Sequence, residues 1–235
     1  MEIGRLSAAA PATAEPPRPA PSRRAWTSRG CPPAKRLLDL VLAGLFLILC
    51  LPVLLPAALL LYAADPGPVI LRQTRIGLHE KPFAMLKLRT MRSGDDRAQR
   101  ELNRRELLGD TACRAPDGLY KPAHDPRITP VGRIVRRFSI DELPQLVNVL
   151  LGEMSLVGPR PSLPWEVALF TEEQRRRHEC VPGITGLWQV MGRNRLSMPQ
   201  MLALDLAYLE TGSLALDLWI LARTPAAVIL SRNTR

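Results

Sequence analysis

The feature that most constrains this chain is an uncharged, strongly apolar stretch of 25 residues, 40–64. At ~1.5 Å of rise per residue, a helix of this length can cross the hydrocarbon core of a bilayer. Pro52 and Pro56 lie in the middle of the stretch. Each proline removes a backbone donor and clashes with the carbonyl four residues earlier, so we expect a kink there. The sequence therefore predicts a membrane helix with an internal bend.

Basic residues flank the apolar stretch on both sides. Cytoplasmic segments beside membrane helices are enriched in Lys and Arg. If both flanks follow this rule, the helix is re-entrant, entering and leaving the bilayer by its cytoplasmic face. A plain spanning helix is the alternative, because prolines are tolerated in membrane helices. The basic residues are Arg23, Arg24, Arg29, Lys35 and Arg36 before the stretch, and Arg72, Arg75, Lys81, Lys87 and Arg89 after it.

The overall charge calls for an anionic partner. The 235 residues include 32 Lys and Arg against 22 Asp and Glu, a net charge of +10. Nucleic acid, anionic lipid and a phosphorylated substrate would each match this charge. Aromatic residues make up only 5% of the chain, too few for a platform that stacks single-stranded nucleic acid. An apolar fraction of 46% excludes a wholly disordered chain.

The cysteine and histidine pattern indicates neither a disulfide framework nor a zinc site. The four cysteines form no Cys-x-x-Cys pair, and the three histidines form no pair with helical spacing. We therefore expect a reducing compartment. The residues in question are Cys31, Cys50, Cys113, Cys180, His79, His124 and His178.

Composition divides the chain into three segments. Residues 1–34 are rich in Pro, Ala and Arg, which predicts a disordered basic tail. Residues 35–64 hold the membrane helix. Residues 65–235 are expected to form the cytoplasmic domain.

Periodicity within 65–235 predicts a mostly helical α+β fold with a small β-hairpin. The stretches 69–75 and 83–89 have strand character and are joined through Gly77 and Pro82. Alternation places Lys87 and Arg89 on one face of the second strand and two leucines on the other. Helical patterns cover 97–108, 139–151, 165–179 and 199–230, the last with Gly212 as a candidate break.

Two adjacent carboxylates, Asp141 and Glu142, follow the basic pair Arg136 and Arg137. Ser139 and Glu142 have the spacing of a capping box at the start of a helix. With Asp141 as the cap instead, Pro144 would fall in the first turn, where its missing N–H costs little. Either arrangement predicts carboxylates at or beside a helix N-terminus next to arginines, which is a phosphate site. A carboxylate there could attack phosphorus, or share Mg²⁺ with phosphate oxygens.

Two further motifs are candidates for anion binding. Arg160 stands between two prolines in 158–161, which restricts its backbone and holds the arginine in an extended loop. The glycine-rich segment 182–192 is followed by Arg193 and resembles a nucleotide loop only loosely. A loop with a solvated arginine is the alternative for the motif at Arg160.

Together these residues resemble the bacterial sugar transferases, the monotopic phosphoglycosyl transferases that act on polyprenol phosphate. The resemblance covers roughly residues 35–230, with the motifs in the family's order. The matching segments are KRLLD at 35–39, GPVILRQTRIG at 67–77, LKLRTM at 86–91, DPRIT at 125–129, the long run 132–161, PGITGLWQV at 182–190, GRN at 192–194 and LDLWI near the C-terminus.

The resemblance implies transfer of a sugar-1-phosphate from a UDP-sugar to undecaprenyl phosphate at the cytoplasmic face of the bacterial inner membrane, with release of UMP. This would be the first membrane step of exopolysaccharide, O-antigen or glycoprotein glycan assembly. It implies that Asp141 forms a covalent phospho-sugar intermediate and that Glu142 serves the Mg²⁺ site or activates the lipid phosphate. The residues implied to bind substrate are Arg136, Lys87, Arg89, Arg160 and Arg193, and Pro52 is implied to bend the membrane helix.

The sequence departs from the family's pattern at Leu51, where well-studied members carry serine before the bending proline. The segment between Met91 and Asp125 is also longer than in the smallest members. A membrane module that binds nucleotide-sugar without turnover, and a membrane-tethered nucleic-acid binder, are the competing interpretations. The sugar, the glycan pathway and the oligomeric state, including a homo-oligomer, stay open.

Overall fold

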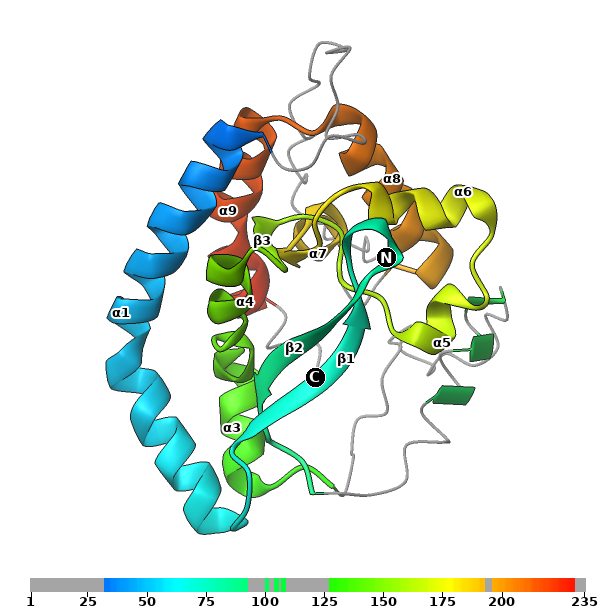
Figure 1. Cartoon of the computed structure of the whole chain (residues 1–235). Coiled ribbons are helices and arrows are strands. Elements are labelled where there is room, and N and C mark those ends of the chain that lie inside the picture. The colour runs from blue at the N-terminus through cyan, green and yellow to red at the C-terminus, as the bar shows by residue number, and fades with distance from the viewer. Residues whose placement is uncertain are drawn as a thin grey trace, which may run out of the picture.

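The computed structural model describes residues 32–92, 100–101, 104–105, 107–108, 127–192 and 196–230. The tail expected over 1–34 and the long segment before Asp125 lie mostly outside these residues, as does Arg193. The described part is mostly helical with a two-stranded antiparallel hairpin, which confirms the α+β expectation. Figure 1 shows the long helix α1 along one side, the hairpin in front and shorter helices around them.

Helix α1 (Pro33–Ala64) is a single uninterrupted helix that begins with a proline in its first turn, where a missing N–H costs little. It runs through Pro52 and Pro56, and its axis bows away from the rest of the molecule (Figure 1). Its buried residues fall near its two ends, at Lys35, Asp39 and Ala43 and at Ala57 and Leu61. No residue of 44–56 is buried. The middle of α1 is therefore largely exposed, although Leu47 and Leu54 still pack against the apolar clusters of the domain.

Three charged side chains hold the first turns of α1 to the domain. Lys35 Nζ lies 2.6 Å from Asp217 Oδ2 of helix α9 (Leu214–Leu230). The Asp39 carboxylate accepts from Ser155 Oγ at 2.8 Å and from the Leu156 amide at 3.1 Å. Arg36 donates to the last carbonyls of helix α4 (Gln145–Leu151), those of Val149 and Leu150, at 2.6 and 2.8 Å. Lys35 and Arg36 of this flank are thus also structural anchors.

The hairpin consists of β1 (Ile70–Ile76) and β2 (Pro82–Leu88), which confirms the two predicted strands with a shift of one residue at each end. Its register pairs Ile76 with Pro82 and Ile70 with Leu88. The free edge of β2 is held by a side chain of α4, because Asn148 accepts from the Leu86 amide and donates to the Ala84 carbonyl. This contact fixes the hairpin against α4.

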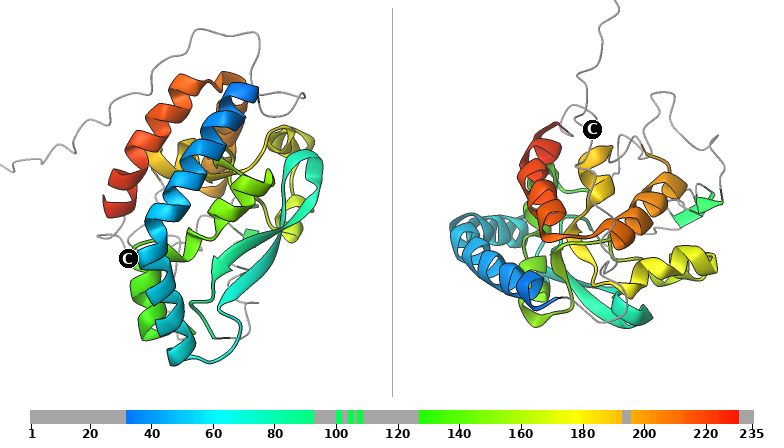
Figure 2. Two further views of the ribbon diagram at one scale, coloured as in Figure 1. Left: turned by 60° about the vertical axis from the view of Figure 1, so that its left-hand side comes forward. Right: turned by 90° about the horizontal axis from the view of Figure 1, so that it is seen from above.

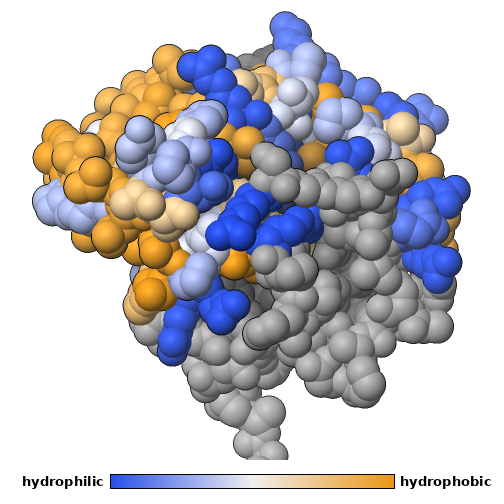
Figure 3. All heavy atoms as spheres, turned by 90° about the horizontal axis from the view of Figure 1, so that it is seen from below, coloured by the Kyte–Doolittle hydropathy of each residue, from blue (hydrophilic) through white to orange (hydrophobic). Residues whose placement is uncertain are grey.

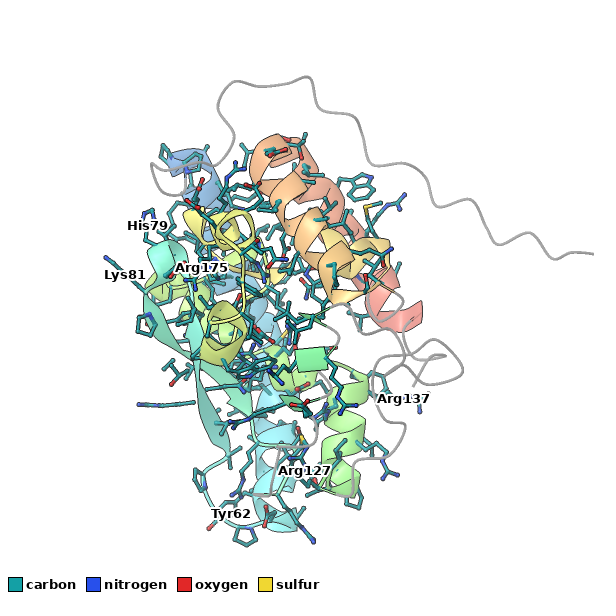
Figure 4. The ribbon with its side chains drawn as sticks, turned by 90° about the vertical axis from the view of Figure 1, so that its right-hand side faces the viewer. Tyr62, His79, Lys81, Arg127, Arg137 and Arg175 are labelled. Atoms are coloured by element: carbon teal, nitrogen blue, oxygen red, sulfur yellow. The ribbon has the colours of Figure 1, made fainter. Side chains whose placement is uncertain are left out.

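The tip of the hairpin is the short helix η1 (Leu78–Glu80), in which His79 and Glu80 have positive φ. Figure 4 shows Arg175 beside this tip, near His79 and Lys81. Arg175 Nη1 lies 3.0 Å from the Glu80 carboxylate. The tip is therefore pinned to the short helices that follow α5 (Pro164–Val167), namely α6 (Glu172–Arg175) and η4 (Arg176–Glu179).

A second, parallel pair of strands, β3 (Ser155–Val157) and β4 (Gly183–Thr185), was not predicted. Strands of three residues are too short to show a period, so the sequence gives no signal for them. Gly158 and Gly183 approach so closely that a side chain on either would meet the backbone of the other segment. This explains the glycine at the start of the motif 182–192.

The predicted helices agree with the structure in part. The pattern 199–230 forms α8 (Met198–Thr211) and α9, separated at Gly212 as expected. The pattern 165–179 is wrong as one helix, because residues 168–171 separate α5 from α6. Thr171 caps α6 by accepting from the Gln174 amide. The remaining helices are α3 (Pro130–Arg137) and α7 (Leu187–Met191).

Two apolar clusters join α1 to the domain. The larger one packs Ala43 of α1 with residues of β2, α4, β3, α7, α8 and α9. The smaller one packs Ala57 and Leu61 of α1 with Leu88 of β2 and Val135 of α3, and Ile140 lies against it. Figure 2 shows α1 alongside α9 and the hairpin on the other side of the body. The second half of α1 therefore lies under the segment that carries Asp141.

Candidate active site

The turn between α3 and α4 carries the adjacent carboxylates. Ser139 adopts a left-handed conformation with φ of 56°, and the short helix η3 (Ile140–Glu142) follows it. The Glu142 amide donates to the Ser139 backbone carbonyl at 3.2 Å, and Ser139 makes no side-chain cap. The predicted capping box is therefore wrong, and so is Asp141 as a cap. The left-handed residue reverses the chain before α4 begins, with Pro144 as the residue preceding it.

Two cations from different elements meet Glu142. Lys87 Nζ of β2 lies 3.3 Å from Glu142 Oε1. Arg160 Nη1, from the loop after β3, lies 4.0 Å from the same oxygen. The Arg160 side chain is 36% exposed, so the pair is open to solvent on that side. The structure thus brings together Lys87, Glu142 and Arg160, three of the residues that the resemblance implied for the site.

Asp141 lies in an environment that disfavours its charged form. Burial, together with the neighbouring Glu142 carboxylate, raises its pKa above the ordinary value, while Lys87 and Arg136 act in the opposite direction. Burial lowers the pKa of Lys87, with Glu142 opposing the shift. Shifted carboxylate and amine groups that lie together are typical of reactive sites. Asp141 is therefore the better candidate for a nucleophile, and Glu142 for an ion-paired partner.

The other predicted basic residues occupy different positions. Arg136 contributes to the electrostatic environment of Asp141 and contacts Met91 Sδ at 2.9 Å. Its neighbour Arg137 is exposed and projects outward (Figure 4). Arg89 donates to the Asp65 backbone carbonyl and lies 3.6 Å from its carboxylate, so it holds the loop that follows α1. Arg193 lies outside the described residues, and Pro52 lies in the exposed middle of α1.

Sequence reasoning missed one cation beside the site, Arg75, which it treated only as part of a basic flank. Its side chain is buried and its pKa falls to about 10 because of burial and the nearby Arg160. In the hairpin register Arg75 faces Phe83, so strand alternation places it on the same face as Lys87. Its position on the same face of the hairpin as Lys87 is the signal by which the sequence could have identified Arg75.

The two carboxylates fit Mg²⁺ only in the presence of a phosphate ligand. In the described ranges, no group of three or more His, Cys, Asp or Glu side chains is placed to hold a metal ion. Mg²⁺ is commonly bound by one or two carboxylates, with substrate phosphate oxygens and water completing its shell. Asp141 and Glu142 could supply the carboxylates of such a site, and the remaining ligands would then have to come from a bound phosphate group and water.

The face that carries α1 is strongly apolar. Figure 3 shows apolar side chains gathered on the side of the molecule where α1 lies, next to hydrophilic residues. Among the described residues, α1 is the one helix long and apolar enough to cross a membrane. An exposed apolar surface of this size is typical of a membrane or protein contact. It is lined by Leu37, Leu40, Val41, Leu45, Phe46, Ile48, Leu49, Leu51, Val53, Leu55, Leu59, Leu60 and Tyr62.

Comparison with known proteins identifies the family. A family model described as "Bacterial sugar transferase" matches residues 31–231. The chain is 42% identical over 207 residues to the UDP-glucose:undecaprenyl-phosphate glucose-1-phosphate transferase of Caulobacter vibrioides, covering 85% of this chain and 71% of that protein. It is 39% identical over 201 residues to the exopolysaccharide production protein ExoY of Rhizobium meliloti, covering 86% of this chain and 88% of that protein.

A third relative is larger. The chain is 39% identical over 202 residues to the undecaprenyl-phosphate galactose phosphotransferase of Salmonella typhimurium, which covers 85% of this chain but 41% of that protein. The chain therefore spans about two fifths of the length of this relative. With most of its length matched and with relatives of this identity, the chain belongs to the bacterial sugar transferase family, a family of sugar-phosphate transferase enzymes.

Proposed function

We propose that this protein transfers a sugar-1-phosphate from a UDP-sugar to undecaprenyl phosphate, releasing UMP, as an early membrane step of bacterial polysaccharide assembly. The observation that carries the proposal is the pair Asp141 and Glu142 in one turn, with Lys87 and Arg160 on Glu142. This turn lies above the second half of the apolar helix α1. Relatives named for glucose-1-phosphate and galactose phosphate transfer to undecaprenyl phosphate support it.

In the first step, an Asp141 carboxylate oxygen attacks the phosphorus that bears the sugar. The new bond joins Asp141 to the phospho-sugar, and the bond from that phosphorus to the UMP oxygen breaks, so UMP leaves with the electron pair. Lys87 and Arg160 stabilise the charge that builds up on the phosphate oxygens. Forming a covalent intermediate divides one displacement into two steps, so a single phosphate pocket can serve donor and acceptor in turn.

In the second step, a phosphate oxygen of undecaprenyl phosphate attacks the phosphorus of the intermediate. The bond from Asp141 to phosphorus breaks, and the carboxylate is regenerated while the lipid diphosphate-sugar leaves. Mg²⁺ held by Glu142 and Asp141 would neutralise charge on the diphosphate. Before substrate binds, the Glu142 carboxylate is ion-paired with Lys87 and Arg160. The diphosphate would replace it as the partner of these two cations.

We also propose that α1 is re-entrant, with both ends and the domain on the cytoplasmic side of the inner membrane. Both ends of α1 pack on the same domain, through Lys35 and Asp39 at the start and Leu61 at the end. A straight span would carry these ends to opposite faces of the bilayer. The exposed middle of α1, which contains Pro52, is the part available for insertion into lipid.

The test is UMP release from a panel of UDP-sugars by purified protein with undecaprenyl phosphate and Mg²⁺. Asp141→Asn should abolish release and remove the covalent intermediate. Glu173→Gln, at an exposed carboxylate paired with Arg176, is the matched control and should retain full activity. Full activity of Asp141→Asn would exclude Asp141 as the nucleophile. Binding of UDP-sugar without turnover by the wild type, whichever sugar is used, would indicate a non-catalytic module instead.

A further inference from the structure

The loop at residues 158–162, which carries Arg160, has few donors with which to hold itself in place. Pro159 and Pro161 have no backbone N–H. The carbonyl oxygens of the loop are therefore its main points of attachment. An arginine that meets a phosphate must be held within a fraction of an ångström to be effective, so what grips these carbonyls decides where Arg160 points.

Two buried guanidinium groups grip adjacent carbonyls of this loop. Arg177 Nη2 donates to the carbonyl of Arg160 itself at 2.7 Å. Arg75 Nη1 donates to the next carbonyl, that of Pro161, at 3.0 Å. Both side chains are almost fully buried, and they come from η4 and β1, far apart in the sequence. The backbone at Arg160 and Pro161 is thus held from two sides by Arg177 and Arg75, which together form a clamp.

Further hydrogen bonds hold the two ends of the loop 158–162. The Gly183 amide donates to the Pro159 carbonyl at 2.8 Å, and the Ile76 amide donates to the Ser162 carbonyl at 2.9 Å. Ser162 Oγ lies 3.1 Å from His178 Nε2. Every residue from 159 to 162 is therefore attached to a neighbouring element through a carbonyl oxygen.

We propose that Arg75 and Arg177 are positioning residues for the transfer reaction, which hold the Arg160 guanidinium at the Asp141–Glu142 turn without touching substrate. This inference rests on the proposed function for its effect on catalysis. Nothing in the sequence singled out Arg177, because it lies in a run of three arginines, and the sequence does not show that it is the buried one of the three.

The two arginines differ in what balances their charge. Arg177 forms a buried ion pair with Asp205 of α8. Arg75 instead donates from Nε and Nη2 to the neutral Gln73 side chain, at 3.2 and 2.9 Å. The charge of Arg177 is therefore cancelled locally, whereas that of Arg75 also acts on the site, consistent with its electrostatic coupling to Arg160 and Glu142. Arg177 gives the cleaner test of positioning alone.

A buried ion pair could equally serve only to stabilise the fold, and the experiment separates the two roles. Removing one partner alone would leave a buried charge unpaired, so Arg177→Met is combined with Asp205→Leu. This double variant, Arg160→Met and their combination form a mutant cycle measured by UMP release. Arg176→Met, which loses a partly exposed arginine paired with Glu173, is the control.

We expect Arg160→Met to lower kcat/KM about 100-fold and the Arg177→Met/Asp205→Leu variant to lower it about tenfold. In the Arg160→Met background, adding Arg177→Met and Asp205→Leu should lower kcat/KM by less than about twofold, because the guanidinium that they position is already absent. Arg75→Lys, which keeps the charge but loses the forked guanidinium, should behave in the same non-additive way. Fully additive losses, or wild-type activity of both clamp variants, would overturn the proposal.

A second readout does not depend on turnover. Hydrogen exchange of peptides covering 156–163 should be faster in the Arg177→Met/Asp205→Leu and Arg75→Lys variants than in the wild type. It should be unchanged in Arg176→Met, and exchange in α4 should stay at the wild-type rate in all of them. If the wild type releases no UMP, the proposed function fails while this readout still decides whether the clamp exists. Unchanged exchange over 156–163 in both clamp variants would refute it.

Discussion

At the scale of single residues, the site is a balance of charges around one turn. Asp141 has a neighbouring carboxylate that raises its pKa and two cations, Lys87 and Arg136, that lower it. Glu142 in turn is held by Lys87 and Arg160. Removing Glu142, Lys87 or Arg136 therefore shifts the pKa of Asp141. The chemistry of Asp141 is therefore set by residues contributed from three separate elements.

This balance makes the pH dependence of the first step predictable. The nucleophile must be ionised, so activity falls on the acid side as Asp141 becomes protonated. Glu142→Gln removes a like charge, which lowers the pKa of Asp141 and shifts the acid limb of the profile to lower pH. Lys87→Met removes an opposing positive charge and should shift the limb to higher pH. The measurement is the burst of UMP in a single turnover, at the residual rate of each variant.

Glu173→Gln is the control for this pair, because that carboxylate is exposed and lies in α6. Its acid limb should coincide with that of the wild type. Shifts of the same sign in Glu142→Gln and Lys87→Met would contradict the assignment of the limb to Asp141, because the two changes remove charges of opposite sign.

At the scale of elements, α1 works at its two ends in different ways. Its first turns are fixed to the domain by charged side chains, and its last turns pack through small and branched apolar ones. The intervening stretch is a continuous helix through Pro52 and Pro56, and none of its residues is fully buried. The start of α1 thus packs on the domain, its middle is largely exposed, and its end packs on the domain again.

Lys35 tests the charged end. Its ammonium group is buried against Asp217, which also accepts from Tyr208 Oη at 2.6 Å. Lys35→Met should destabilise the fold by about 3–5 kcal/mol, because it leaves a buried carboxylate without its cation. Adding Asp217→Asn should recover most of this loss. Thermal unfolding in detergent measures both effects.

Lys81→Met, at an exposed residue near the hairpin tip (Figure 4), is the control and should leave the melting temperature unchanged. If Lys35→Met melts at the same temperature as this control, the ion pair contributes nothing to holding α1.

Ala57 tests the apolar end. It is buried in the cluster on which Ile140 packs, directly before Asp141. Ala57→Leu overfills this cluster, and overpacking a buried site costs about 1–3 kcal/mol or moves the backbone. A displacement of Asp141 by about 1 Å is enough to lower turnover by about 100-fold. We therefore expect turnover to fall at least tenfold while the protein stays in the membrane fraction.

The matched control is Ala63→Leu, which adds the same group at an exposed position of α1. It should retain full activity and membrane association. Equal activity of the two variants would show that the second half of α1 does not position the catalytic turn.

At the scale of the whole molecule, the topology of α1 decides where the active site lies relative to the lipid. Both ends of α1 contact one body, and its exposed residues form a continuous apolar surface. Single cysteines at Ala34 and Thr74, both exposed, test the arrangement once the native cysteines are replaced. We expect an impermeant thiol reagent to label both in inside-out vesicles and neither in intact cells. Labelling of the two positions from opposite faces would show a spanning helix.

The comparison of sequence and structure differs from element to element. The hairpin and the break at Gly212 followed from local chemistry, namely alternation and a helix-breaking residue. The capping box at Ser139 failed because the chain turns there through a left-handed residue, which a spacing of Ser and Glu does not reveal. The parallel pair β3 and β4 was not predicted, because strands of three residues are too short to show a periodic pattern in the sequence.

The sequence by itself determined the class of the protein, because long motifs in order and a 25-residue uncharged stretch depend on residue identity alone. It also named Asp141, Glu142, Lys87 and Arg160 as candidates. Only the tertiary structure decided which of them meet, since Lys87 and Glu142 are 55 positions apart in the chain. Contacts at such separation arise from burying α1, the hairpin and α4 against one another. No local pattern encodes them, and the same packing placed Arg75 and Arg177 behind Arg160.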